Sequence, residues 1–177
     1  GGITGETGVL NIAKDATMNM GTATVIQDAI NIDGTVNASA LSSYDFAKLY
    51  GDITGGGVIN LTVASSGTYK MFDETSNNNI AINIMDKAYN VVNNGKDGVV
   101  VSVKPIEDLV KDINISSQTA GVVSALANSA DKNIQKISLA AQHLLNSGDT
   151  KLLEEESATI FLFIKTSSLP FVFRQLT

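Results

Sequence analysis

Residues 1–104 alternate apolar and polar positions with the two-residue period of a β-strand. One short unit recurs among them, an asparagine between two aliphatic residues, at Leu10-Asn11-Ile12, Ile30-Asn31-Ile32, Ile59-Asn60-Leu61 and Ile82-Asn83-Ile84. Because successive side chains of a strand point to opposite faces, each unit places its aliphatic residues on one face and its asparagine on the other. The units begin 20, 29 and 23 residues apart, which is typical of one supersecondary unit per repeat, so the pattern predicts a solenoid of stacked strands.

The predicted interior of this solenoid is a continuous column of aliphatic side chains, which comprises Ile12, Ile30, Ile32, Val36, Ile59, Leu61 and Val63. Glycines between the strands predict corners, because glycine tolerates the left-handed backbone of tight turns. Asp33-Gly34 and Asn94-Gly95 are also strong β-hairpin signals, so an antiparallel sandwich is the alternative fold. We expect residues 42–49 to form an excursion from one coil, which would explain the interval of 29.

The pattern changes near Pro105 to the spacing of α-helices. Ile106, Leu109, Val110 and Ile113 follow one another at i, i+3, i+4 and i+7, the spacing of one buried helical face. Further helices are predicted over residues 117–128, from an N-cap at Asp131 to a C-cap at Gly148, and over residues 150–157. The predicted fold is therefore mainly β, a parallel β-solenoid followed by short α-helices.

Three regions are expected: solenoid coils over residues 1–104, a helical segment over 105–157, and an apolar tail over 158–177. The tail is equally compatible with a pair of strands and with a helix. Its phenylalanines are expected to cover the open end of the solenoid and shield it from edge-to-edge pairing; the alternative is an aggregation-prone or partner-binding segment. These residues are Phe161, Phe163, Phe171 and Phe173.

Charge and composition narrow the possible functions. Eighteen acidic residues against twelve Lys and Arg give a formal net charge of −6, which argues against nucleic-acid binding. With no cysteine, the chain has neither disulfides nor thiolate metal sites. The apolar stretches 160–164 and 169–173 fall short of the roughly 20 residues of a membrane-spanning helix, so no membrane insertion is expected.

Several stretches resemble the passenger of bacterial autotransporters, the proteins of type V secretion. Residues 8–20, 30–37 and 55–63 are similar to its coils, and residues 118–128 and 131–147 to the helical linker after the last coil. The resemblance covers about residues 8–156. It implies a right-handed parallel β-helix, exported through the periplasm to the cell surface or secreted, whose C-terminal part supports folding and secretion.

Two features depart from that family. The residues after Glu156 are too few for a membrane barrel of many strands, and residues 158–177 do not continue the linker pattern. The first residues show no signal-peptide pattern, so the chain is expected to be an internal fragment.

No catalytic, cofactor-binding or metal-binding residue is selected from the sequence, and no cofactor is expected. The lone His143 has no partner at catalytic spacing and is expected to be a packed or surface residue. Asp73-Glu74 with residues 77–79, and the turn at residues 93–98, offer oxygen ligands but match no calcium loop. The first is expected to be a solvated turn, and the second a hairpin or a coil corner.

The candidate carboxylate pairs for glycoside cleavage are Asp28 with Asp33 and Asp45 with Asp52. Without tryptophan and with only four tyrosines, a sugar-processing cleft is not expected. The run Gly55-Gly56-Gly57 lacks the Lys and Ser/Thr of a phosphate-binding loop and is expected to be a corner. Glu154-Glu155-Glu156 is expected to be a solvated helix face.

The expected function is that of a non-catalytic scaffold that supports secretion. The alternative is an adhesin-type module that binds surface glycans or proteins through exposed strand faces or through loops at residues 42–50 and 73–79. A polysaccharide-active enzyme is the third hypothesis, and it would require carboxylates gathered on one face of the solenoid.

Overall fold

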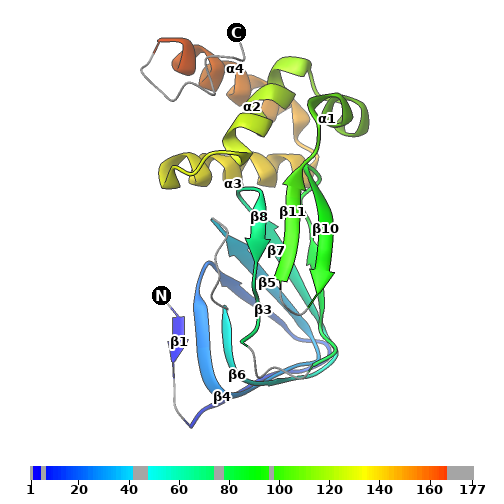
Figure 1. Cartoon of the computed structure of the whole chain (residues 1–177), viewed down its shortest axis with the longest axis vertical. Helices are drawn as coiled ribbons and strands as arrows, with labels where there is room; N and C mark the ends of the chain where they lie inside the picture. Colours follow the sequence, from blue (N-terminus) through cyan, green and yellow to red (C-terminus); the bar gives the residue numbers. More distant parts are fainter. Residues whose placement is uncertain (1, 5–6, 42–47, 74–77, 96–97, 167–177) are drawn as a thin grey trace. The chain divides into compact units, whose positions relative to one another are not determined.

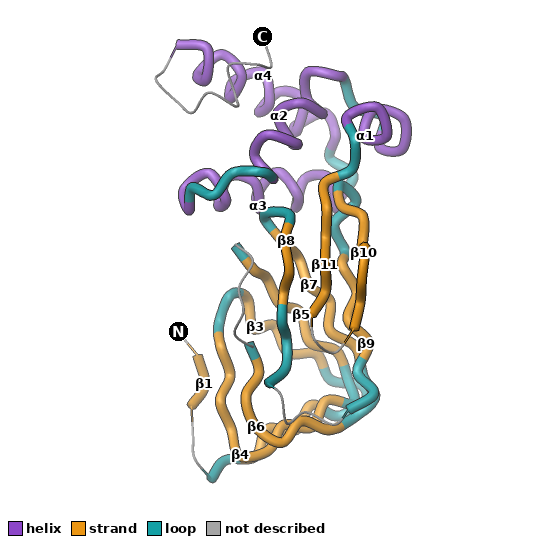
Figure 2. Tube along the Cα trace, in the orientation of Figure 1, coloured by secondary structure: helices purple, strands orange, loops and turns teal. Residues whose placement is uncertain are grey.

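The structure is a computed structural model that describes residues 2–4, 7–41, 48–73, 78–95 and 98–166. The chain divides into two compact units, and each is described by itself. The first comprises residues 1–63, 67–85 and 91–101, and the second comprises residues 64–66, 86–90 and 102–177. The described residues hold strands and helices in roughly equal share (Figures 1 and 2).

Two parallel sheets, between which the chain alternates, make up most of the first unit. The strands are β1 (Gly2–Thr4), β2 (Val9–Ile12), β3 (Thr17–Gly21), β4 (Thr24–Ile32), β5 (Thr35–Ala40), β6 (Leu49–Thr54), β7 (Val58–Val63), β8 (Gly67–Tyr69), β9 (Ala81–Ile84), β10 (Tyr89–Gly95) and β11 (Gly98–Val103). In one sheet β4 pairs with β1, β2 and β6; the other has the order β3-β5-β7-β9. All of these pairings are parallel.

The alternative of an antiparallel sandwich is therefore wrong for these two sheets. Asp33-Gly34 carries the chain from β4 of one sheet to β5 of the other, so it does not form a hairpin turn. The glycines at 55–57 carry it from β6 to β7 in the same way, which confirms the corner predicted there. A third sheet has the order β10-β11-β8, with β11 antiparallel to β8. Asn94-Gly95 ends β10, and β11, its neighbour in this sheet, begins at Gly98.

The asparagine units form two ladders rather than one column. Asn11 is in register with Asn31 in the first sheet, and Asn60 is in register with Asn83 in the second. The interval of 29 residues separates Ile30 in one sheet from Ile59 in the other, so it does not measure a repeat within one sheet. Within a sheet, hydrogen-bonded asparagines lie 18, 20 or 23 residues apart. Residues 42–47 of the expected excursion lie outside the described residues.

The predicted interior of the first unit is confirmed. All seven aliphatic residues expected to point inward are buried, with exposed fractions of 7% or less: Ile12, Ile30, Ile32, Val36, Ile59, Leu61 and Val63. Buried positions alternate strictly with half-buried ones along β5 and β7. The aliphatic face of each strand thus supplies the core, as its two-residue period predicts.

The corners at Gly34 and Gly57 stack on one another, and their backbones approach so closely that a side chain would not fit at either glycine. A Cβ on Gly34 would lie 2.2 Å from the Ala13 carbonyl oxygen, and a Cβ on Gly57 would lie 2.2 Å from the Gly34 carbonyl oxygen. Backbone hydrogen bonds continue through these corners, since Gly34 N donates to Ile12 O and Gly57 N to Ile32 O. Glycine is therefore required at these positions by contact between successive levels.

The second unit contains four helices: α1 (Ile106–Ile113), α2 (Ser117–Ala127), α3 (Lys132–Ser147) and α4 (Thr150–Thr166). Asp131 caps α3 by accepting hydrogen bonds from the backbone of Asn133 and Ile134, and the helix ends at Gly148 with a left-handed backbone. Both predicted caps are confirmed. Parallel strands followed by helices are also confirmed, whereas a mainly β content overstates the strand share of the described residues.

Helix α4 continues to Thr166 instead of ending near residue 157, so a strand pair at the start of the tail is wrong. No glycine or proline interrupts residues 150–166, and Leu153 and Ser157 are buried on one face of the helix. The buried face anchors the first half of the helix, and without a breaking residue the helix continues to Thr166. Residues 167–177 lie outside the described residues, so the expected cap by the phenylalanine tail stays a prediction.

Candidate functional site

The acidic residues considered for catalysis do not gather into a described cleft. Asp28, Asp33 and Asp52 are exposed, and Asp45 lies outside the described residues. Asp33 accepts hydrogen bonds from Asn31 Nδ2 at 2.9 Å and from the backbone N–H of Gly56 at 3.3 Å. The Asp33 carboxylate therefore stabilises the glycine corner at residues 55–57, which follows β6, the neighbour of β4 in its sheet.

The other candidates have ordinary structural places. His143 is exposed on α3, and Asp73 accepts a hydrogen bond from the backbone N–H of Gly51 at 3.3 Å. Glu74, Asn77 and Asp97 lie outside the described residues. Among the residues that the structure describes, no three His, Cys, Asp or Glu side chains are placed to hold a metal ion.

The most regular polar feature is the pair of asparagine ladders. In the first sheet Asn31 donates to Asn11 at 2.9 Å and Thr54 donates to Asn31 at 3.0 Å. In the second sheet Asn37 donates to Asn19 at 2.8 Å and Asn60 donates to Asn37 at 3.1 Å. Each amide thus bonds its neighbour on the next strand, which fixes the register of the sheet and presents a polar outer face.

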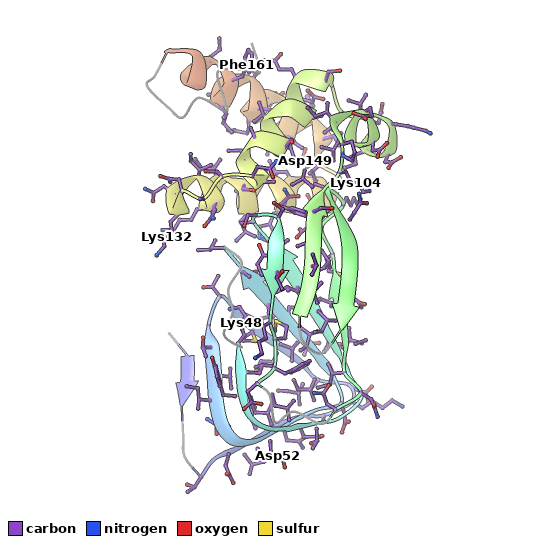
Figure 3. The ribbon with its side chains drawn as sticks, viewed as in Figure 1. Lys48, Asp52, Lys104, Lys132, Asp149 and Phe161 are labelled. Carbon is purple, nitrogen blue, oxygen red and sulfur yellow. The ribbon has the colours of Figure 1, made fainter. Side chains whose placement is uncertain are left out.

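Lys48, which directly precedes β6, is a buried charged residue that no sequence pattern indicated. It is only 5% exposed, and its Nζ donates to the carbonyl oxygens of Thr22 at 2.9 Å and Ala23 at 3.1 Å. Burial lowers the pKa of its ammonium group. Figure 3 shows Lys48 among the side chains of the first unit, whereas the exposed Asp52 lies on the outside. Lys48 binds the turn between β3 and β4.

In the second unit a polar face of α3 binds two strand connections. Ser138 Oγ donates to Ala64 O at 2.6 Å, Asn146 Nδ2 donates to Asp86 Oδ1 at 2.8 Å, and Asn146 Oδ1 accepts from the Lys87 backbone at 3.2 Å. Ala64 directly follows β7, and Asp86 and Lys87 lie between β9 and β10. These bonds join the connections to α3, which the apolar spacing of α3 did not predict.

Glu154 on α4 caps the beginning of α2. Its carboxylate accepts hydrogen bonds from Ser116 N at 2.7 Å, from Ser116 Oγ at 2.8 Å and from Thr119 Oγ1. Burial opposes ionisation, but the hydrogen bonds from Thr119 and Ser116 outweigh it and lower the pKa of Glu154. Glu155 and Glu156 are exposed as expected, but the expected solvated face is wrong for the half-buried Glu154.

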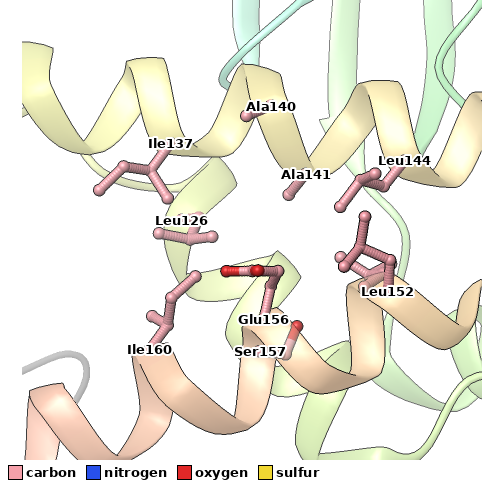
Figure 4. A pocket seen from close by; sticks show the side chains of 10 residues that line it. Leu126, Ile137, Ala140, Ala141, Leu144, Leu152, Glu156, Ser157 and Ile160 are labelled. Atoms are coloured by element: carbon pink, nitrogen blue, oxygen red, sulfur yellow. The ribbon is translucent and has the colours of Figure 1, made fainter.

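An apolar groove lies between α3 and α4, with α2 at its floor (Figure 4). We call it the α3/α4 groove. It has a volume of about 300 Å³, and its walls include Leu126, Ile137, Leu144, Leu152 and Ile160. Of the described residues that line it, Glu156 alone is charged. The groove is shaped to take apolar side chains, with a single negative charge at its edge.

Comparisons with protein-family models, with curated proteins and with solved structures found no match to the chain. In the described part of the chain, no helix is both long and apolar enough to cross a membrane.

Proposed function

We propose that this chain is a non-catalytic scaffold segment of an exported bacterial surface protein. In this proposal, the first unit is part of a right-handed parallel β-helix, and the helices that follow support its folding and secretion, as in the autotransporter passengers that the sequence resembles. The protein acts at the cell surface or after secretion.

The observation that carries the proposal is that side chains of the same kind are in register on successive parallel strands. Asn37 is in register with Asn60, and Val36 with Ile59 on the opposite face. A strand whose outer amides and inner aliphatic groups both match the next strand offers it a template. Growth of the fold from one level to the next would let folding assist the outward movement of the chain.

The use of charged side chains supports a scaffold role as well. Asp33, Lys48 and Glu154 each bond backbone groups at a corner, a turn or a helix end. Hydrogen bonds of this kind stabilise the folded chain. They also occupy these three charged groups, which a catalytic role would require to be available to a substrate.

Surface display of paired glycine variants tests the proposal. The 177-residue chain is supplied with a signal peptide and an outer-membrane barrel in frame, and display is measured by protease accessibility on intact cells. Gly57→Ala places a Cβ 2.2 Å from a backbone oxygen of the preceding level, whereas Gly56→Ala places one in open space. We expect Gly57→Ala to lower display several-fold and Gly56→Ala to match the original chain. Equal display of all three would contradict a role for stacking in secretion.

The exposed asparagine faces favour one alternative, an adhesin-type module for surface glycans or proteins. Unlike the core, these amides are accessible to solvent along the outer face of both sheets. A glycan array and a cell-adherence assay separate the two functions: specific binding that is lost in Asn37→Ala would favour the adhesin, and no binding would favour the scaffold.

A further inference from the structure

We propose that the C-terminal segment of this chain, residues 169–174, docks in the α3/α4 groove. The inference is independent of the scaffold role. A segment of the same chain would then cover the apolar surface that the described helices leave open.

The first argument is the exposure of the groove walls. Ile137 is 44% exposed and Leu152 is 39% exposed, although both line a concave apolar site. The volume of about 300 Å³ lies at the small end of the usual range for ligand pockets, about 300–1,000 Å³. The site therefore suits one or two large side chains, whose burial would remove these walls from water.

The second argument is the sequence that follows α4. The helix ends at Thr166, and Leu169-Pro170-Phe171-Val172-Phe173 comes shortly after it. The segment supplies large apolar side chains for a site of this size. Pro170 cannot continue a helix and favours an extended residue before it, so the chain is able to turn away from the helix axis.

The third argument is reach. Ile160 on the groove wall precedes the end of α4 by six residues, which is about 9 Å along the helix at a rise of about 1.5 Å per residue. Residues 167–170 can span about 13 Å when extended. Phe171 can therefore return to the level of Ile160.

The fourth argument is charge. Arg174 is the only charged residue in 167–177, and Glu156 is the only charged one among the described residues that line the groove. A segment whose phenylalanines enter the groove would bring Arg174 to its edge. The pair of opposite charges favours this segment over an uncharged or acidic partner.

Disulfide trapping tests the proposal, because the full chain contains no cysteine of its own. Ala140→Cys introduces a thiol on the exposed wall of the groove, and Phe171→Cys introduces one in the segment. The matched control combines Phe171→Cys with His143→Cys, an exposed position of α3 that does not line the groove. Dilute protein is oxidised with diamide, and products are followed by non-reducing electrophoresis and mass spectrometry.

The expected result is a monomeric disulfide that forms faster for the Ala140→Cys pair than for the His143→Cys pair. Equal rates, or no disulfide in either variant, would overturn the proposal. A disulfide between two molecules would also overturn it and would identify a second copy as the occupant. Circular dichroism of each reduced variant verifies that the helices are retained.

Charge reversal gives an independent readout. In the Ala140→Cys/Phe171→Cys background, Glu156→Lys is expected to slow trapping about two- to five-fold, the effect of a partly exposed ion pair. Adding Arg174→Glu is expected to restore the rate. If Glu156→Lys leaves the rate unchanged, or if Arg174→Glu does not restore it, the assignment of this segment to the groove is wrong.

Discussion

At the scale of single residues, two charged side chains of this chain bind its own backbone. Glu154 satisfies the backbone N–H of Ser116, and Lys48 satisfies two carbonyl groups of the turn between β3 and β4. The groups at a helix beginning have no partner inside the helix, and a carboxylate there also meets the positive end of the helix dipole. Both side chains thus stabilise ends and turns that the regular hydrogen bonding of helices and sheets leaves open.

Glu154→Gln gives a pH-dependent prediction. The folded protein holds the pKa of Glu154 below its unfolded value, so its contribution is complete above about pH 4.3 and is lost as the pH falls through the folded pKa. We expect Glu154→Gln to lower the free energy of unfolding by about 1 kcal/mol at pH 7. Urea unfolding at pH 7 and at lower pH should show this difference shrinking with acid. The exposed neighbour provides the control, because Glu155→Gln should change little at either pH; a constant loss at all pH values would contradict the assignment.

At the scale of elements, each strand has one face for the core and one for the ladder. Leu61 and Thr62 are adjacent in β7, yet Leu61 is fully buried and Thr62 is partly exposed. The same two-residue period recurs on β5. The same substitution is therefore expected to change the stability of the fold very differently at two neighbouring positions.

Leu61→Asp should destabilise the first unit strongly, whereas Thr62→Asp should be tolerated. A charge at position 61 has no partner in the aliphatic interior, and its burial is expected to cost at least about 3 kcal/mol. Thermal unfolding followed by circular dichroism at 215 nm measures the change in melting temperature. If both variants melt together with the original chain, Leu61 does not belong to the core.

The bounds of an element could be predicted from the sequence where a local signal marks them. Asp131 and Gly148 predicted both ends of α3, because a cap acts within one turn of its helix. The end of α4 was missed because no glycine or proline marks it before Pro170. The role of Glu154 was also missed, since it depends on a residue 38 positions away, and no local rule reports such a contact.

At the scale of the whole molecule, the sequence predicted stacked parallel strands but not how the repeats divide between sheets. Periodicity identifies a strand and its buried face, yet it does not say which of two sheets the strand joins. Asn31 and Asn60 therefore looked like successive members of one column, although they belong to different sheets. The α3/α4 groove was equally unpredictable, because its walls come from three helices whose packing the sequence does not encode locally.

The parallel register of the strands is the central claim, and nuclear Overhauser contacts measure it most directly in a chain of 18.6 kDa. The account predicts backbone contacts between Asn37 and Asn60 and between Asn11 and Asn31, in the pattern of neighbouring parallel strands. Contacts instead between consecutive strands, such as β4 and β5, in an antiparallel pattern would contradict it.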